Sequence, residues 1–278
     1  MSIAAPENFE TIVQPRPGWI AVNWRELWDR RELLYFFVWR DIAVRYKQTV
    51  LGVAWAVLQP VFSMLIFTVI FGNLAKMPSD GQPYPVFVYA GLLPWMFFST
   101  AVSGAGQSLI NQQALLTKIY LPRLFVPAAS VGGGLVDLAV SFLVFACLLA
   151  YYGVIPGWGA LMLPFLILLT LVAALGVGLS LAALTVTYRD FRYVIPFMIQ
   201  AWMYVSPVIY PVSLVPAEWQ WLLALNPMTG IIDGFRAALL GGTWNLAPLA
   251  VSTVSACALL AYGLFYFRTT ERRFADVA

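Results

Sequence analysis

Side chains that could carry chemistry are few in this 278-residue chain, and none of them is a histidine. Hydrolytic enzymes usually recruit an imidazole, and soft-metal sites need clustered cysteine or histidine. The two cysteines, Cys147 and Cys257, lie far apart within apolar runs. We therefore expect no catalytic residues, no disulfide framework and no metal site, and we expect that the chain is not an enzyme.

Nucleotide binding also lacks its usual residues. None of the lysines, Lys47, Lys76 and Lys118, follows a glycine, so the glycine-rich phosphate-binding loop with its lysine is missing. If the protein uses ATP, another chain binds it. We expect no cofactor on this chain.

One acidic residue stands out. Asp137 is the only charged residue in 124–188, and it follows the glycines at 132–134. A glycine cluster lets a neighbouring helix approach closely and shield a carboxylate. This membrane-embedded acid either serves transport directly or is paired with a lysine or arginine of a neighbouring helix, and the sequence leaves both readings open.

The composition predicts a bilayer as the solvent. Hydrophobic residues make up 61% of the chain and charged residues 10%, whereas about 25% of a soluble domain is charged. Most of the surface must therefore face lipid. The net charge of only +3 does not favour nucleic acid as a partner.

The chain begins with two segments that do not span. Residues 1–23 contain several prolines and no apolar periodicity, which predicts a loose tail. In 24–47, tryptophan, tyrosine and aliphatic residues recur at helical spacing between charged residues. This pattern indicates an amphipathic helix that lies along the membrane surface in contact with lipid. An ordinary helix packed on a soluble partner is the alternative.

Residues 48–278 are expected to form an all-α integral membrane domain with six transmembrane helices. These spans lie at about 50–75, 86–110, 127–152, 161–187, 193–210 and 248–267. The stretch 124–188 would measure nearly 100 Å as one helix, so two spans must share it. The glycines and proline between 153 and 159 mark the break.

The segment 216–240 is apolar but interrupted by polar residues, which predicts a re-entrant helical hairpin between spans five and six. Asn226 followed by Pro227 is typical of a helix N-cap and first position. After it, one apolar stripe runs to the helix-ending glycines at 241–242. The stripe consists of Met228, Ile231, Ile232, Phe235 and Leu239.

Basic residues predict the orientation. With six spans, 14 of the 16 lysines and arginines fall on the side that holds both termini, and only Lys76 and Arg236 fall opposite. Both termini should therefore be cytoplasmic.

Two further groups are candidates for function. Aromatic rings within the spans offer faces along which sugar rings or acyl chains could slide, although they could equally pack helices together. This candidate translocation path contains Trp55, Tyr89, Trp95, Phe98, Trp202, Tyr204 and Tyr210. The second cytoplasmic loop, 115–124, is short and basic yet rich in apolar residues, which favours docking of a soluble partner.

Several stretches, in this order and spacing, resemble a known family. They are 40–52, Trp55 with Gln59-Pro60, Leu93-Pro94-Trp95, 118–123, Tyr188-Arg189-Asp190 with Tyr193 and Pro196, 206–210, Leu225-Asn226-Pro227, and Phe235-Arg236. From about residue 24 to the C-terminus the chain resembles the type-2 ABC exporter permeases of polysaccharides, such as the O-antigen, capsule and teichoic-acid export permeases.

The resemblance implies the permease subunit of an ATP-driven exporter, multi-pass in the bacterial cytoplasmic (inner) membrane, which moves lipid-linked polysaccharide out of the cytoplasm. It implies a homodimer joined to two copies of an ATP-binding cassette subunit, which would carry ATP and Mg. We expect coupling to that subunit through Thr117, Lys118, Ile119, Tyr120, Leu121, Pro122 and Arg123, together with Arg40, Asp41, Arg45 and Tyr46.

Two other functions remain open at this stage. One is a type-2 ABC exporter of small lipophilic drugs, and the other is an ion-coupled carrier or lipid flippase that acts alone. The second alternative conflicts with the scarcity of ionisable groups within the spans, since such carriers keep several of them.

Overall fold

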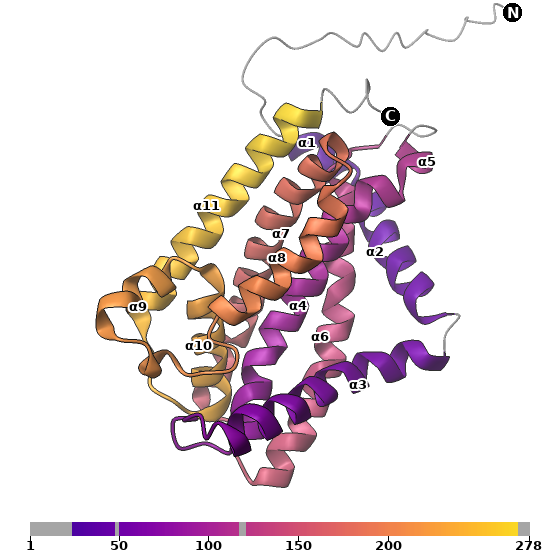
Figure 1. Ribbon diagram of the computed structural model, residues 1–278. Coiled ribbons are helices and arrows are strands. Elements are labelled where there is room, and N and C mark those ends of the chain that lie inside the picture. Colours follow the sequence, from indigo (N-terminus) through magenta and orange to yellow (C-terminus); the bar gives the residue numbers. More distant parts are fainter. Residues whose placement is uncertain (1–23, 48–49, 117–120, 272–278) are drawn as a thin grey trace, which may run out of the picture.

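The computed structural model describes residues 24–47, 50–116 and 121–271 of the chain (Figure 1). Within these residues every regular element is a helix, as the sequence predicted. The elements are α1 (Trp24–Asp29), α2 (Arg31–Tyr46), α3 (Val50–Phe67), η1 (Thr68–Leu74), α4 (Tyr84–Asn111), α5 (Gln113–Leu116), α6 (Phe125–Tyr152), η2 (Trp158–Met162), α7 (Leu163–Thr187), α8 (Phe191–Val205), η3 (Val212–Leu214), α9 (Ala217–Ala224), α10 (Pro227–Leu240) and α11 (Leu246–Glu271). The predicted tail, 1–23, lies outside the described residues.

Five of the described helices are long and apolar enough to cross a bilayer. They are Ala54–Leu74, Tyr84–Asn111, Phe125–Tyr152, Trp158–Thr187 and Leu246–Glu271. The first combines α3 with the π-helical turn η1, and it continues through Pro60. Its exposed apolar surface can be covered only by lipid or by another protein.

The expected fifth span is shorter than the sequence suggested. The expectation was a helix over 193–210, but α8 ends at Val205 and Ser206 is extended. Fifteen residues of α-helix rise only about 22 Å, against about 30 Å of hydrocarbon. A sixth crossing therefore requires the irregular chain after α8 and stays a prediction.

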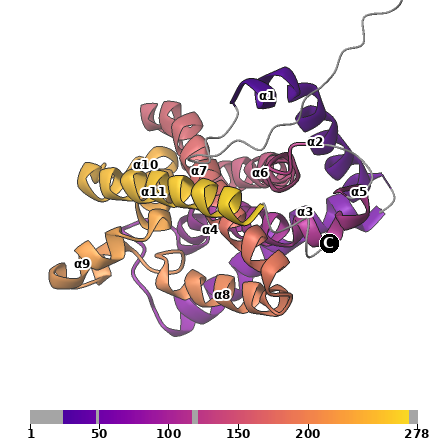
Figure 2. The ribbon, with the colours of Figure 1, turned by 90° about the horizontal axis from the view of Figure 1, so that it is seen from above.

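Helix α4 forms the centre of the bundle (Figure 2). It packs against α6, α7, α8 and α10. In the most apolar 18-residue stretch of α4, 78% of the residues are buried, whereas the corresponding share for the α3–η1 helix is 11%. The sequence could not tell these two apolar helices apart, because a run that is hydrophobic on all sides has no face that marks the core.

Helices α7 and α11 meet at two glycines, so their backbones touch. A Cβ atom added to Gly263 would lie 2.2 Å from the carbonyl oxygen of Gly176, and one added to Gly176 would lie 2.5 Å from the backbone of Leu259 and Leu260. No side chain fits at either position. Small residues at a helix contact are the usual route to tight packing in lipid, where the hydrophobic effect does not drive helices together.

A helix break lies between α6 and α7, at the residues where the sequence analysis placed one. Helix α6 ends at Tyr152, and Gly153 follows in the left-handed conformation with φ of 68°. A 3-10 turn, η2, then leads into α7. Glycine adopts this conformation without the steric cost that a Cβ would bring.

The helix start at Asn226 is also confirmed. The Asn226 side chain accepts a hydrogen bond from the Met228 amide at 3.0 Å, and all five residues of the predicted stripe are buried. Asn226 also accepts from Trp202 Nε1 at 3.0 Å and donates to Ser206 Oγ at 2.9 Å. One amide thus caps α10 and ties it to α8, but the depth of α9 and α10 in the membrane stays a prediction.

The irregular chain after α8 is held by a buried arginine. The side chain of Arg236 donates to the carbonyl oxygens of Pro207 and Val208, each at 2.7 Å, and to those of Tyr210 and Phe87, each at 3.3 Å. Arg236 is only 6% exposed. Its guanidinium therefore replaces the helical hydrogen bonds that the prolines around 207–211 break.

The close contact of α7 and α11 yields a stability prediction. Gly263→Ala should lower the stability of the folded protein by about 1–3 kcal/mol, because the methyl group must push the two backbones apart. Thermal unfolding of the detergent-solubilised protein measures this. Gly157→Ala, where an added Cβ meets nothing within 4 Å, is the matched control, and equal midpoints for the two variants would contradict the contact.

Candidate functional site

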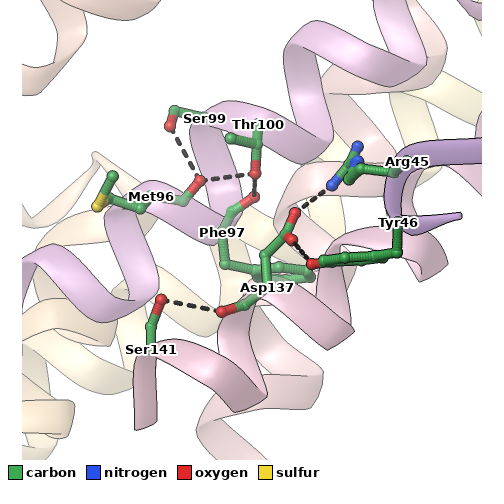
Figure 3. Close-up of polar contacts among 8 residues, drawn as sticks. All are labelled: Arg45, Tyr46, Met96, Phe97, Ser99, Thr100, Asp137 and Ser141. Atoms are coloured by element: carbon green, nitrogen blue, oxygen red, sulfur yellow. Dashed lines mark hydrogen bonds and ion pairs between the residues drawn. The ribbon is translucent and has the colours of Figure 1, made fainter. Parts of the chain in front are cut away.

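In the described part of the chain, the end of α2 lies against Asp137 of α6. The last turn of α2 lies beside the middle of α6, where Arg45 Nη1 donates to Asp137 Oδ2 and the Tyr46 hydroxyl donates to Asp137 Oδ1 (Figure 3). Of the two readings that the sequence left open, the structure therefore contains the ion pair with a neighbouring helix. The partner comes from α2, 92 residues away in the chain.

The glycines before Asp137 make this approach possible, as the sequence indicated. A Cβ at Gly132 would lie 3.1 Å from a Val38 methyl group, and one at Gly133 would lie 3.8 Å from the Asp41 Cβ. Gly134 instead faces the Phe97 ring of α4 at 3.2 Å. The glycine triplet thus seats α2 on one side of α6 and α4 on the other.

Asp137 lies well inside the span. It follows the start of α6 by twelve residues, or about 18 Å of rise. The 28-residue helix exceeds the hydrocarbon thickness by about 12 Å, so a centred α6 would place Asp137 about 12 Å inside the hydrocarbon. An unpaired carboxylate at that depth is costly, and pairing with Arg45 and Tyr46 lowers this cost.

Tyr46 remains a hydrogen-bond donor throughout the physiological pH range. Burial, followed by the hydrogen bond to Asp137, raises the pKa of Tyr46 to about 12. Deprotonation would place a second negative charge against the carboxylate. The cluster therefore consists of one cation, one anion and one neutral donor.

A cavity of about 320 Å³ opens beside the ion pair. It lies between α2, α3, α4 and α6, and Arg45 and Asp137 form one wall. Trp55 and Gln59 of α3 form another, and Thr100 of α4, whose hydroxyl donates to the Met96 and Phe97 carbonyl oxygens, also lines the cavity. The side chain of Arg45 is 46% exposed and that of Asp137 is 23% exposed, so both ionised groups remain accessible from the cavity.

The other residues expected to couple to a partner have different surroundings. Arg40 pairs with its neighbour Asp41 at 2.8 Å on the same helix. Leu121 is buried, and Arg123 Nη1 donates to the carbonyl oxygen of Glu271 at 2.7 Å. Arg123 thus fastens the end of the loop to the last turn of α11. Thr117, Lys118, Ile119 and Tyr120 lie outside the described residues.

Most of the expected path aromatics pack inside the protomer. Tyr89 stacks on Phe145 with ring centroids 5.5 Å apart, and Phe98 meets Trp202 edge-on at 5.2 Å. Trp95 is likewise buried, whereas Tyr210 is half-buried and Trp55 and Tyr204 are exposed. Of the seven aromatic residues expected on the path, Trp55 is the one in the cavity beside Asp137.

Gln59 and Thr100 are site residues that the sequence did not single out. Gln59 was noted only beside Pro60, as part of a family motif, and Thr100 lies in an apolar span without a spacing signal. A polar residue on a lipid-exposed helix is the signal that would have marked Gln59.

Comparison with known proteins identifies the chain. The family model described as "ABC-2 type transporter" matches residues 32–240. This chain therefore belongs to the ABC-2 type transporter family.

Three relatives align with most of this chain. It is similar to the O-antigen export system permease protein RfbA of Myxococcus xanthus (33% identity, covering 77% of this chain and 82% of the relative). It is also similar to the polysialic acid transport protein KpsM of Escherichia coli (26%, covering 84% and 91%) and to the inner membrane transport permease YadH of Escherichia coli strain K12 (30%, covering 66% and 74%).

The contact between Arg45 and Asp137 can be tested by a double-mutant cycle. Arg45→Met and Asp137→Asn should each lower the unfolding midpoint, and the double variant should lose less than the sum, with a coupling energy on the order of 1 kcal/mol because Arg45 is half exposed. Arg31→Met, on the same helix but away from α6, is the control. Strictly additive losses would mean that the two side chains do not interact.

Proposed function

We propose that this chain is the permease subunit of an ATP-driven exporter that moves lipid-linked polysaccharide from the cytoplasmic side across the bacterial inner membrane. The observation that carries the proposal is the 33% identity to an O-antigen export permease over 77% of the chain. The similarity to a polysialic acid transport protein over 84% of the chain supports the same substrate class.

The motor would be a separate chain. ATP and Mg would be bound by two copies of an ATP-binding cassette subunit, since the sequence has no phosphate-binding loop. The loop 117–123 would dock on that subunit. Movement of the loop would reach α6 directly, because Arg123 lies two residues before this helix. It would reach α2 through the contact between Asp137 and Arg45.

The conduit would need two copies of this chain. In the described part of one protomer α4 fills the centre, and its Tyr89 and Phe98 pack against rings of α6 and α8. A hydrophilic polymer must be shielded from hydrocarbon along its whole route. A homodimer supplies that route between its two protomers without unpacking either core.

Loss of the protein tests this function. Cells that lack the chain should accumulate lipid-linked polysaccharide in the cytoplasm and lose it from their surface, as detected by a glycan-specific antibody before and after permeabilisation. Normal surface glycan with loss of drug efflux would instead favour a drug exporter. Transport by the purified chain alone, driven by an ion gradient, would favour a carrier.

The docking loop can be tested by replacement of 117–123 with a Gly/Ser linker. Insertion into the membrane should remain, but export should stop while ATP hydrolysis by the partner continues, since movement is no longer transmitted. The readouts are surface glycan and phosphate release by the purified complex. A linker of equal flexibility in place of 154–157, at the other end of α6, is the control; export that survives the first replacement unchanged would refute the docking role.

The orientation is tested by cysteine labelling. In a chain with Cys147 and Cys257 replaced by serine, Lys76→Cys should react with a membrane-impermeant maleimide on intact spheroplasts, and Arg189→Cys should react only after lysis. Both positions are exposed, so access depends on the side of the membrane. The reverse pattern would show that the termini lie outside.

A further inference from the structure

The cavity between α2, α3, α4 and α6 presents both signs of charge to whatever fills it. Arg45 and Asp137 both line the cavity, and the two side chains neutralise each other. An anionic head placed against Arg45 would also meet the Asp137 carboxylate, and like charges at close range repel. A ligand without net charge avoids this repulsion.

Hydroxyl groups fit this wall better than other neutral groups do. A hydroxyl donates and accepts at the same time, so neighbouring hydroxyls can donate to Asp137 and accept from Arg45 while the ion pair stays closed. The two charges of a zwitterionic head would compete with the ion pair for the same two side chains. Gln59 and Thr100 add further polar groups to the lining.

An aromatic ring stands at the opening of the cavity. Trp55 lines the cavity, yet it is 61% exposed in the protomer. Carbon–hydrogen faces of a sugar ring pack on such a surface, and the hydroxyls at the ring edge remain free for polar partners. A volume of about 320 Å³ lies at the lower end of the range for small-ligand pockets.

An apolar stripe leads away from Trp55 along α3 and η1. Leu58, Phe62, Leu65, Ile66 and Val69 follow at helical spacing, and all of them are exposed. The cavity therefore continues into a surface that suits a hydrocarbon chain. The polar cavity suits the sugar head of an amphiphile, and the apolar stripe suits its lipid tail.

We propose that this cavity is a binding subsite for the saccharide head of a lipid-tailed glycan, with the head held by Trp55, Gln59 and the Arg45–Asp137 pair and the tail lying along α3. This inference rests on the proposed function and adds to it the place where the lipid-proximal sugar is held. The subsite is formed within one protomer, so the second copy is not required for binding.

The test uses amphiphiles that differ only in the head. The full-length chain, purified with its ATP-binding partner and placed in lipid nanodiscs, is labelled with a dodecyl glycoside that carries a diazirine in its tail, and the labelled peptides are mapped by mass spectrometry. Dodecyl maltoside, dodecylphosphocholine and dodecyl phosphate then compete for the label. We expect labelling on α3, and we expect the maltoside to compete at roughly tenfold lower concentration than the other two.

Two substitutions of exposed residues locate the site without disturbing the core. Trp55→Leu and Gln59→Leu should each reduce the labelling of α3 about fivefold. Trp39→Leu, which replaces a tryptophan of similar exposure on α2 outside the cavity, should leave it unchanged. Thermal unfolding of each variant accompanies the measurement, so that a misfolded variant is recognised.

Three outcomes would overturn the inference: equal competition by all three heads, strongest competition by dodecyl phosphate, or labelling that Trp55→Leu and Trp39→Leu reduce equally. None of these depends on export. If surface glycan is lost without the chain but the heads compete equally, the proposed function stands and the subsite fails. If the maltoside is preferred but surface glycan is normal without the chain, the subsite stands and the proposed function fails.

Discussion

A charge inside a lipid bilayer must be neutralised by a neighbouring group, and in this protein Asp137 of α6 obtains its partners from helix α2. The ion pair with Arg45 and the hydrogen bond from Tyr46 determine where α2 lies against α6, and the glycines at 132–134 provide the space for that approach. Arg45 and Asp137 also line the cavity beside α3. A segment that the sequence places at the membrane surface is thereby fixed to the middle of a span.

The need for polar partners also explains the region between α8 and α10. Where prolines break the helix after α8, Arg236 donates to three carbonyl oxygens of that chain and to one of α4. Asn226 caps α10 and also binds Trp202 and Ser206. Irregular backbone in a membrane protein persists only when such partners are present. Polar side chains here hold the helices of an apolar chain in place. Such contacts connect helices that must move together in the permease function that we propose.

Much of the fold could be predicted from the sequence because its signals are local. Apolar runs, the glycines and proline after α6, and the Asn226-Pro227 cap each indicate a helix or its end within a few residues. The partner of Asp137 could not be predicted, because any of several arginines could have reached it, and Arg45 is 92 residues away. The burial of Tyr89 and Phe98 could not be predicted either. In a span that is apolar on all sides, an aromatic ring could face the protein core, the lipid or a translocation path. The path of the chain after α8 was also hidden, because its carbonyl oxygens accept hydrogen bonds from Arg236, which lies in a later helix.

Cysteine cross-linking in native membranes tests the seating of α2 against α6 most directly. In a chain without its own cysteines, Val38→Cys with Gly132→Cys should form a disulfide rapidly under mild oxidation, since a Val38 methyl group lies 3.1 Å from the position of a Cβ at Gly132. Val44→Cys with Gly132→Cys should not, because Val44 is exposed on the same helix. Equal cross-linking of both pairs, or of neither, would contradict the account.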